Sequence, residues 1–557
     1  MSVRGDVPSD RKEVGSSVQK HTSRPNVLLV VLDTTRAKTA LSTTSPVMPN
    51  FGAIAAEGAS FETAITNGPW TLPAHASLFT GQYTTDHDTH AGRGYFDPER
   101  PPLAVRLRKA GYRTAAVSAN TWISPTYGFG TGFETFWGPN EPIVPSRPAS
   151  RSQSRQEGEG GCVAALWSNG FRKLADLANR AYERYGGGYD TGARLTNRRI
   201  KYWLRQWSRD RPFFLFANYL EPHLHYDAPE PFRYRYLPDD IEPQEADAVS
   251  QDAWGYVAGR IDMTDREFEA LRALYKGELR YLDFRLGELY RTLASRGLLD
   301  STLVIFVGDH GENIGEHGLM DHQYSLYDTV LHVPLCIRYP KEVPAGRVVS
   351  SPVEVRDVFP TVLDAAGLSI EPSEADTKAV SDRSLLASFG PPNPNQYRDR
   401  DEFTNQENGP CKEPGDAESN GKSGESTGSI DPAAEHCPHA IAEYLVPRPF
   451  IETLREHAGS ANVNLSAFDR GLRCLRTSRW KYVERTDGTE ALFDLKNDPA
   501  ELHDVAKDRP DLATELRATL QAERGAFKTD IHQRPSSEEH DRTTDATKQR
   551  LRALGYI

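Results

Sequence analysis

The chain has 557 residues, with 66 Lys and Arg against 78 Asp and Glu, and a formal net charge of −12 at pH 7. This length allows two or three domains with a large buried core, so folding needs neither metal nor disulfide staples. The acidic balance argues against a general nucleic-acid binder, because neutralising phosphates requires clustered Lys and Arg.

The cysteines and the N-terminus point to one compartment. Five cysteines are scattered without C-x-x-C spacing, which argues against a disulfide framework and a structural zinc site. The N-terminus lacks the apolar core of a signal peptide, and no run reaches the ~18 apolar residues of a membrane helix. We therefore expect a cytoplasmic protein without a transmembrane segment.

Composition divides the chain into four parts. Residues 1–24 and 388–438 are polar, and the second stretch is rich in Pro, Gly, Ser, Asn and acids, so both are predicted to be disordered. They set off a catalytic domain at 25–387 from a C-terminal subdomain at 439–557.

Strand and helix signals alternate along the catalytic domain. Continuous apolar runs, typical of parallel strands buried on both faces, lie at 26–32, 114–118, 212–217 and 302–307. Helical patterns lie between them, at 102–110 and 264–296. This alternation predicts an α/β fold, with a three-layer α/β/α core around a mostly parallel sheet. The C-terminal part is expected to form a smaller α+β subdomain.

Polar side chains follow three of these strands. Asp33 follows the first, Asp309 and His310 follow the fourth, and Glu221, His223 and His225 come after the third. Ligands of such sheets bind beyond the carboxyl ends of the strands, and carboxylates with imidazoles are ligands for divalent cations. A lone Asp after a strand is more often a helix N-cap, but three such ends on one edge favour a site.

One segment carries a specific motif, Gly68-Pro-Trp-Thr-Leu-Pro-Ala-His-Ala-Ser-Leu-Phe-Thr-Gly81. It resembles the signature of the sulfatases, within the alkaline phosphatase superfamily, where the order is nucleophile-x-Pro-x-Arg-x-Ser-x-x-Thr-Gly. The places of that signature are held by Thr71, Pro73, His75, Ser77, Thr80 and Gly81. Other segments resemble later motifs of the family in order, among them 221–226, 308–318, 355–367, 479–482 and 492–499.

The departures from the family fall on its catalytic centre. Sulfatases convert Cys or Ser at the nucleophile position to formylglycine, whose hydrated aldehyde attacks sulfur and is regenerated by elimination. Thr71 cannot yield that aldehyde, because oxidation of its secondary alcohol gives a ketone. His75 stands for the usual Arg, Thr34 for the second acid, and His322 for the active-site Lys. Ser118-Ala-Asn-Thr121 replaces the G-K-W-H element.

The resemblance implies that Asp33, Asp309 and His310 hold a divalent ion, Ca, Mn, Mg or Zn, with Thr71 as a further ligand. A threonine beside a metal is the nucleophile of nucleotide pyrophosphatases, phosphoethanolamine transferases and lipoteichoic acid synthases in the same superfamily. A free alcohol is a poor nucleophile, and a nearby cation lowers its pKa while screening an anionic ester.

His223 and His322 are the further catalytic candidates. In one interpretation they bind substrate oxygens or protonate the leaving group, because imidazole transfers protons near neutral pH. In another they join Glu221 and His225 in a second metal site, which would clamp the attacking and leaving oxygens. The sequence leaves both open. His75 is expected either to donate a hydrogen bond near the metal or only to occupy the position of the family's Arg. Asn120 and His87 are expected to be structural residues of loops.

We therefore expect a metal-dependent hydrolase that cleaves a sulfate or phosphate ester through Thr71, with the phosphoester favoured on chemical grounds. The substrate is expected to be a small-molecule, glycan or lipid ester. Two alternatives remain: a transferase that passes a phosphoryl group to a sugar or lipid alcohol, and an inactive ligand-binding relative. The sequence does not predict the oligomeric state.

Overall fold

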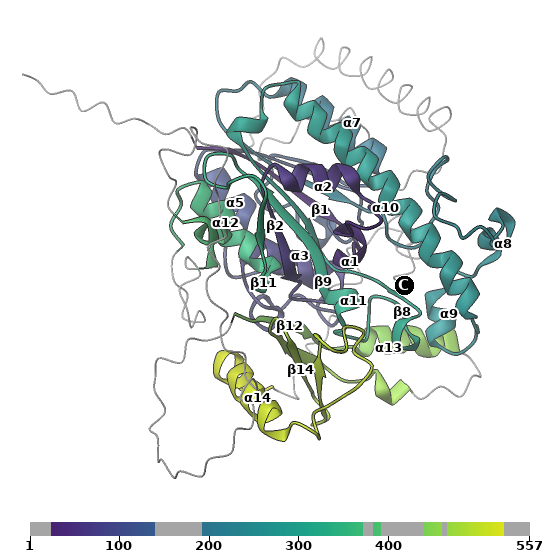
Figure 1. Ribbon diagram of the computed structural model, residues 1–557. Coiled ribbons are helices and arrows are strands. Elements are labelled where there is room, and N and C mark those ends of the chain that lie inside the picture. Colours follow the sequence, from purple (N-terminus) through teal and green to yellow (C-terminus); the bar gives the residue numbers. More distant parts are fainter. Residues whose placement is uncertain (1–23, 140–191, 371–382, 391–437, 459–464, 528–557) are drawn as a thin grey trace, which may run out of the picture.

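The computed structural model describes residues 24–139, 192–370, 383–390, 438–458 and 465–527, and two separate sheets organise them (Figure 1). The tail predicted at 1–24 and the insertion predicted at 388–438 fall almost wholly outside the described residues. No described helix combines the length and the apolar character that a membrane span requires.

The larger sheet has nine strands and is mostly parallel. Its order is β10-β2-β9-β6-β1-β5-β3-β4, with β11 also paired to β2, and only β9 runs antiparallel to its neighbours. The strands are β1 (Asn26–Leu32), β2 (Ala59–Ile65), β3 (Arg113–Ser118), β4 (Thr135–Trp137), β5 (Phe213–Tyr219), β6 (Thr302–Gly308), β9 (His332–Arg338), β10 (Arg347–Val349) and β11 (Val353–Glu354).

Two groups of helices cover this sheet and make the core three-layered. On one face α10 (Asp265–Ala294) contacts α2 (Pro49–Ala56) and α7 (Ala193–Gln206). On the other face α3, α5 and α12 contact one another; their bounds are Thr71–Thr80, Leu103–Lys109 and Val358–Ala365. The shorter helices are α1 (Ala37–Ala40), α4 (Thr84–His87), α8 (Pro243–Ala248), α9 (Ala253–Val257) and α11 (Asp328–Leu331).

Local sequence explains the central elements. Every residue of β1, β5 and β6 is buried, as expected for strands covered by helices on both faces. The four predicted strands and the two predicted helices are confirmed to within two residues at each end. The long helix α10 begins with a capping box, in which Thr264 and Glu267 each bond the other's backbone N–H.

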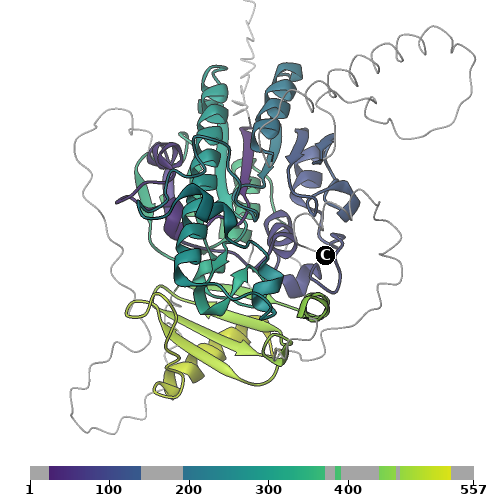
Figure 2. The same cartoon turned by 90° about the vertical axis from the view of Figure 1, so that its right-hand side faces the viewer.

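The C-terminal part forms its own antiparallel sheet below the main body (Figure 2). Its strands are β12 (Ala440–Tyr444), β13 (Leu472–Arg476), β14 (Trp480–Arg485) and β15 (Glu490–Asp494), and α14 (Pro510–Arg524) packs on β13 and β14. Helix α13 (Arg448–Ala458) contacts α9 of the main body. Lys481 of β14 joins the two parts by an ion pair to Asp328 of the main body (2.6 Å), and it also pairs with Glu501 of the C-terminal part (2.7 Å).

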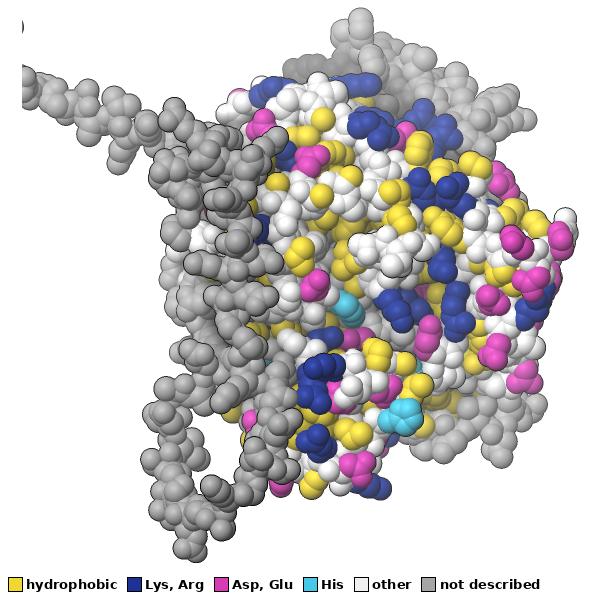
Figure 3. Space-filling model, viewed as in Figure 1, with side chains coloured by type: hydrophobic (Ala, Val, Ile, Leu, Met, Phe, Trp, Pro, Cys, Tyr) yellow, Lys and Arg dark blue, Asp and Glu magenta, His cyan; other side chains and the backbone are white. Residues whose placement is uncertain are grey.

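The sheet topology brings distant segments to one edge. Because β1, β3, β5 and β6 are parallel, their carboxyl ends lie together at that edge. Strand β9 runs the other way, so the segment before it returns to the same edge, carrying the two-stranded ribbon of β7 (Asn313–Ile314) and β8 (Met320–Asp321). Charged side chains of both signs are interspersed on the face drawn in Figure 3.

Candidate active site

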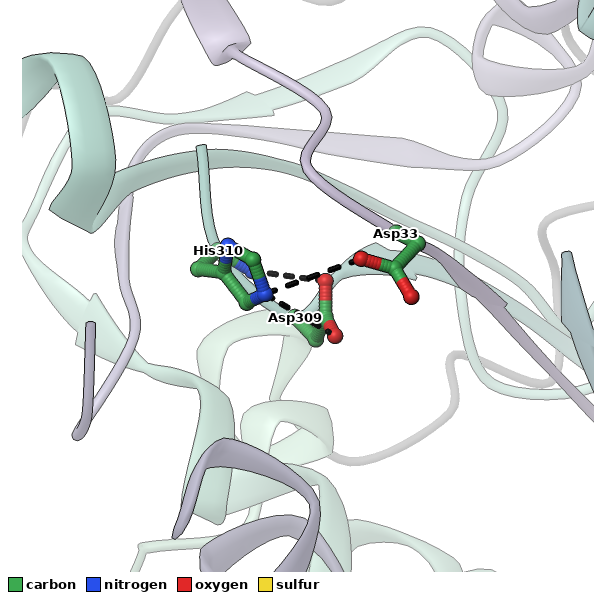
Figure 4. Close-up of side chains that lie close together, drawn as sticks. All are labelled: Asp33, Asp309 and His310. Atoms are coloured by element: carbon green, nitrogen blue, oxygen red, sulfur yellow. Dashed lines mark hydrogen bonds and ion pairs between the residues drawn. The ribbon is translucent and has the colours of Figure 1, made fainter. Parts of the chain in front are cut away.

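Asp33, Asp309 and His310 meet at the carboxyl ends of β1 and β6 (Figure 4). Their ligand atoms all lie within 4.8 Å of one another, and all three side chains are buried. His310 Nε2 is 3.6 Å from Asp33 Oδ1 and 3.5 Å from Asp309 Oδ2. The structure thus brings together three of the four residues predicted to hold a metal.

The hydrogen bonds of these residues leave three acceptors facing one another. His310 Nδ1 donates to the Gly311 carbonyl at 2.9 Å, so in the neutral ring Nε2 carries a lone pair. Neither Asp33 Oδ1 nor Asp309 Oδ2 accepts a hydrogen bond from any described residue. The two carboxylate oxygens are buried acceptors without donors, which is costly, whereas a cation could bind both of them and His310 Nε2. This chemistry fits a divalent ion.

The electrostatics lead to the same conclusion. Burial raises the pKa of Asp33 to about 7, against a hydrogen bond from Asn120 that lowers it. Burial, and then the charge of Asp33, raises the pKa of Asp309 well above its usual range, while burial lowers the pKa of His310. Two carboxylates in this dry site therefore need positive charge from outside the chain to stay ionised together.

Thr71 is the first residue of α3 and is fully buried. Its Oγ1 lies 3.2 Å from His310 Nε2, which places the hydroxyl directly against the ligand group. It also lies at the N-terminus of a ten-residue helix, where exposed N–H groups and the helix dipole favour an anion. The fourth predicted metal ligand is therefore beside the other three.

The remaining signature residues hold α3 in place. Ser77 Oγ pairs with His87 Nε2 at 3.0 Å, and His87 Nδ1 accepts from the Thr89 N–H, so His87 has the structural role predicted for it. Gly81 ends the helix with a φ of 69°, and a Cβ there would lie 2.8 Å from Phe359. The left-handed turn and the close contact explain the glycine.

His75 touches the site through the backbone of α3. Its Nδ1 lies 2.9 Å from the Thr71 carbonyl and 3.5 Å from Asp309 Oδ2. Its ring packs edge-on against Phe129 and Phe216, and burial lowers its pKa to about 4. A neutral ring in this apolar pocket cannot replace the charge of the family's Arg. It fixes the first turn of the helix instead.

Asn120 contacts the site although the sequence suggested only a loop role. Its Nδ2 donates to Asp33 Oδ2 at 2.7 Å and lies 3.5 Å from Thr71 Oγ1. Asn120 follows β3, two strands away from β1 in the sheet, so a strand-end signal was available. A single Asn after a strand does not by itself indicate a residue of a functional site.

The two further predicted histidines form a row with His310. The ring centroid of His322 is 4.3 Å from that of His310 and 5.3 Å from that of His223. His322 Nδ1 is 2.5 Å from Asp321 Oδ1 and 3.4 Å from Glu312 Oε1. Glu312, Asp321 and His322 form a second buried group with ligand atoms within 4.8 Å of one another.

Other polar residues after β5 and β7 lie outside these two groups. Glu221 Oε1 accepts from the Ala193 N–H at 2.8 Å, at the start of α7, and His225 is exposed. His317 stacks on Tyr327 with ring centroids 3.5 Å apart. One of the two interpretations from the sequence placed Glu221, His223, His225 and His322 in a second metal site. Among the described residues, the second group that could hold an ion is Glu312, Asp321 and His322, which shares only His322 with that set.

Comparison with known proteins assigns the family. The family model described as Sulfatase matches residues 25–368, more than half of the chain. The chain belongs to the sulfatase family. A relative from Bos taurus, Arylsulfatase K, is 26% identical over 538 residues, covering 91% of this sulfatase and 83% of the relative. Choline-sulfatase of Rhizobium meliloti is 28% identical over 378 residues, covering 65% and 71% of the two chains.

The fold is shared with solved structures of more than one activity. The phosphonate monoester hydrolase of Agrobacterium radiobacter superposes with a TM-score of 0.59 at 23% identity, covering 90% of this sulfatase and 95% of that chain. Family membership makes the protein a hydrolase of ester bonds. Sulfatase-family enzymes bind a divalent metal ion, and Asp33, Asp309 and His310 are candidate ligands for one in this chain. The fold alone does not select between sulfur and phosphorus esters.

Proposed function

We propose that this sulfatase-family protein hydrolyses a phosphate ester, with Thr71 as the direct nucleophile. The observation that carries the proposal is the position of Thr71 Oγ1, 3.2 Å from His310 Nε2 and beside the buried carboxylates. A hydroxyl at this place needs no prior conversion to attack an ester.

The chain's own residues support the attack. Asp33, Asp309 and His310 would hold the ion, and a divalent cation there lowers the pKa of a neighbouring alcohol and offsets charge on the ester. Oγ1 loses its proton to solvent and forms a bond to phosphorus while the bond to the leaving alkoxide breaks. The alkoxide takes up a proton from solvent, and water then hydrolyses the phosphothreonine to release phosphate. Asn120 Nδ2, which lies near both Thr71 and Asp33, is positioned to donate to an oxygen of the ester.

The order of the three imidazoles supports an assignment of the nucleophile end and the leaving-group end of the site. Thr71 contacts His310, His310 lies against His322, and His322 lies against His223. In-line displacement at phosphorus requires the attacking and leaving oxygens on opposite sides. With the nucleophile at the His310 end, we assign the leaving alcohol to the end formed by His322 and His223.

Threonine chemistry favours phosphorus over sulfur as the reacting centre. In the family's usual route an aldehyde hydrate is regenerated by elimination, which avoids a second attack on sulfur. Thr71 has no such elimination, so its ester must be cleaved by water at the same centre. Two successive in-line displacements are ordinary chemistry for phosphoryl groups.

The test compares matched substrates on one metal-loaded protein. Aryl phosphate, aryl phosphodiester and aryl sulfate carry the same leaving group and are assayed with Mn, Zn, Mg and Ca in turn. We expect a phosphate ester to turn over fastest, and acid quenching to trap phosphate on the peptide that contains Thr71. Thr71→Ser should keep measurable activity, whereas Thr71→Ala should lose about a thousandfold or more.

Two results would contradict the proposal. One is faster cleavage of the aryl sulfate than of either phosphate ester. The other is a Thr71→Ala variant as active as the parent. Added alcohols provide a further measurement in the same assay, because a transferase would form more alkyl phosphate as alcohol rises while ester cleavage stays constant.

A further inference from the structure

The second buried group, Glu312, Asp321 and His322, has more negative charge than its neighbours balance. The four acidic residues of the whole site, Asp33, Asp309, Glu312 and Asp321, are each at most 8% exposed. One divalent ion matches Asp33 and Asp309, and an imidazolium at His322 would match only one of the other two.

The nearby cationic side chain Arg36 is already paired with another carboxylate. Arg36 makes two hydrogen bonds of 2.9 Å to Glu316, so its charge is paired there. His223 is only 3% exposed, and its Nδ1 donates to the Leu224 carbonyl at 2.7 Å, so this ring nitrogen is already bonded to the backbone. An anionic ester entering the site would add further negative charge and increase the imbalance.

Glu312 has a buried carboxylate oxygen that lacks a hydrogen-bond donor among the described residues. Its side chain is 0% exposed, and Oε2 accepts no hydrogen bond from any described residue. The same carboxylate places Oε1 3.4 Å from His322 Nδ1, so the group that holds the unsatisfied oxygen belongs to the cluster. A buried carboxylate oxygen without a donor is costly in a folded protein unless the group takes up a proton or a cation binds it.

We propose that Glu312, Asp321 and His322 hold a second divalent cation, next to the ion of Asp33, Asp309 and His310. The mixture of carboxylate oxygen and imidazole nitrogen suits a first-row ion such as Mn²⁺ or Zn²⁺. The ion takes the place of the proton between Asp321 Oδ1 and His322 Nδ1, which are 2.5 Å apart.

The position of the second cation deepens the proposed function, on which this assignment of its role rests. The His322 end of the imidazole row is the leaving-group end, so the second cation would stabilise the departing alkoxide while the first serves Thr71. Two ions that clamp the attacking and leaving oxygens are an established arrangement for displacement at phosphorus.

The experiment counts ions and needs no substrate. The full chain is stripped with a chelator, then titrated with Mn²⁺ by calorimetry, and bound metal is measured by mass spectrometry; Zn²⁺ is the second probe. We expect two ions per chain in the parent and one in either Glu312→Gln or Asp309→Asn. His317→Gln is the matched control from the same segment and should keep two. Two neighbouring Mn²⁺ ions should also broaden the electron paramagnetic resonance spectrum, an effect that each one-ion variant removes.

The ion counts of the parent and the two variants can overturn the inference. One ion per chain, lost in Asp309→Asn and kept in Glu312→Gln, would leave an Asp321–His322–Glu312 ion pair in place of the second metal site and would leave the proposed function intact. No bound ion with either metal would contradict the first site as well, and with it the proposed function.

Discussion

Thr71 Oγ1 and His310 Nε2 lie 3.2 Å apart, although 239 positions separate the two residues in the chain. The contact joins the first turn of α3 to the loop after β6. The nucleophile and the ion ligands therefore form one unit, and a change to either element should alter both metal binding and attack.

Removing one carboxylate of this unit should affect stability and activity in opposite directions. In Asp309→Asn, Oδ1 can still accept from the His310 and Thr34 N–H groups, and the new amide can face the His310 lone pair. We expect a rise of a few degrees in Tm with chelator present, because a buried like charge next to Asp33 is removed. Ester turnover should fall by about a thousandfold or more. A lower Tm in chelator would contradict the electrostatic description.

Asn120→Ala should slow catalysis as well as lower stability moderately, because Asn120 Oδ1 also accepts from the Trp122 N–H. The substitution removes the 2.7 Å hydrogen bond to Asp33 Oδ2 and the nearby donor for the ester. Losing one such preorganised donor costs about a hundredfold to a thousandfold in kcat. Steady-state kinetics with His317→Gln as the control would measure it. A purely structural role would lower Tm with kcat unchanged.

Replacing His75 by the Arg that the family has at this position should destabilise the fold. His75 is fully buried between Phe129 and Phe216, so His75→Arg would place a larger, charged side chain in a filled apolar pocket. We expect a loss of about 3 kcal/mol or more in the free energy of unfolding. The measurement is urea denaturation, with His75→Gln as a comparison that keeps a donor for the Thr71 carbonyl. Equal stability of parent and His75→Arg would show that the pocket is not filled.

Continuous apolar runs were enough to predict the central strands, since β1, β5 and β6 are buried along their whole length. They also predicted which strand ends carry polar residues, and Asp33, Asp309 and His310 do meet. Strand order could not be predicted. Without it, Asn120 after β3 had no visible relation to Asp33 after β1, because β5 lies between these strands.

The partners of His322 were missed for a different reason. Glu312 and Asp321 become neighbours of His322 only because β7 and β8 pair as a short ribbon over the sheet edge. Two-residue strands have no periodicity that a sequence pattern can show. The family has a Lys at the position of His322, so the resemblance predicted a role for His322. It predicted none for Glu312 or Asp321.

The ion pair between Arg36 and Glu316 should contribute a pH-dependent part of the stability, apart from any bound metal. It links the segment after β1 to the segment after β7, through two hydrogen bonds of 2.9 Å. Burial alone would raise the pKa of Glu316, but Arg36 outweighs it and lowers the pKa from 4.5 to about 2. A depressed carboxylate pKa gives stability that is present above about pH 4.5 and is lost as pH falls toward 2.

Glu316→Gln should therefore be less stable than the parent by about 1–3 kcal/mol at pH 7, with the difference shrinking between pH 4.5 and 2. Denaturant unfolding of both proteins in chelator, across that range, measures the difference, and a gap that stays constant to pH 2 would assign the loss to packing and not to charge.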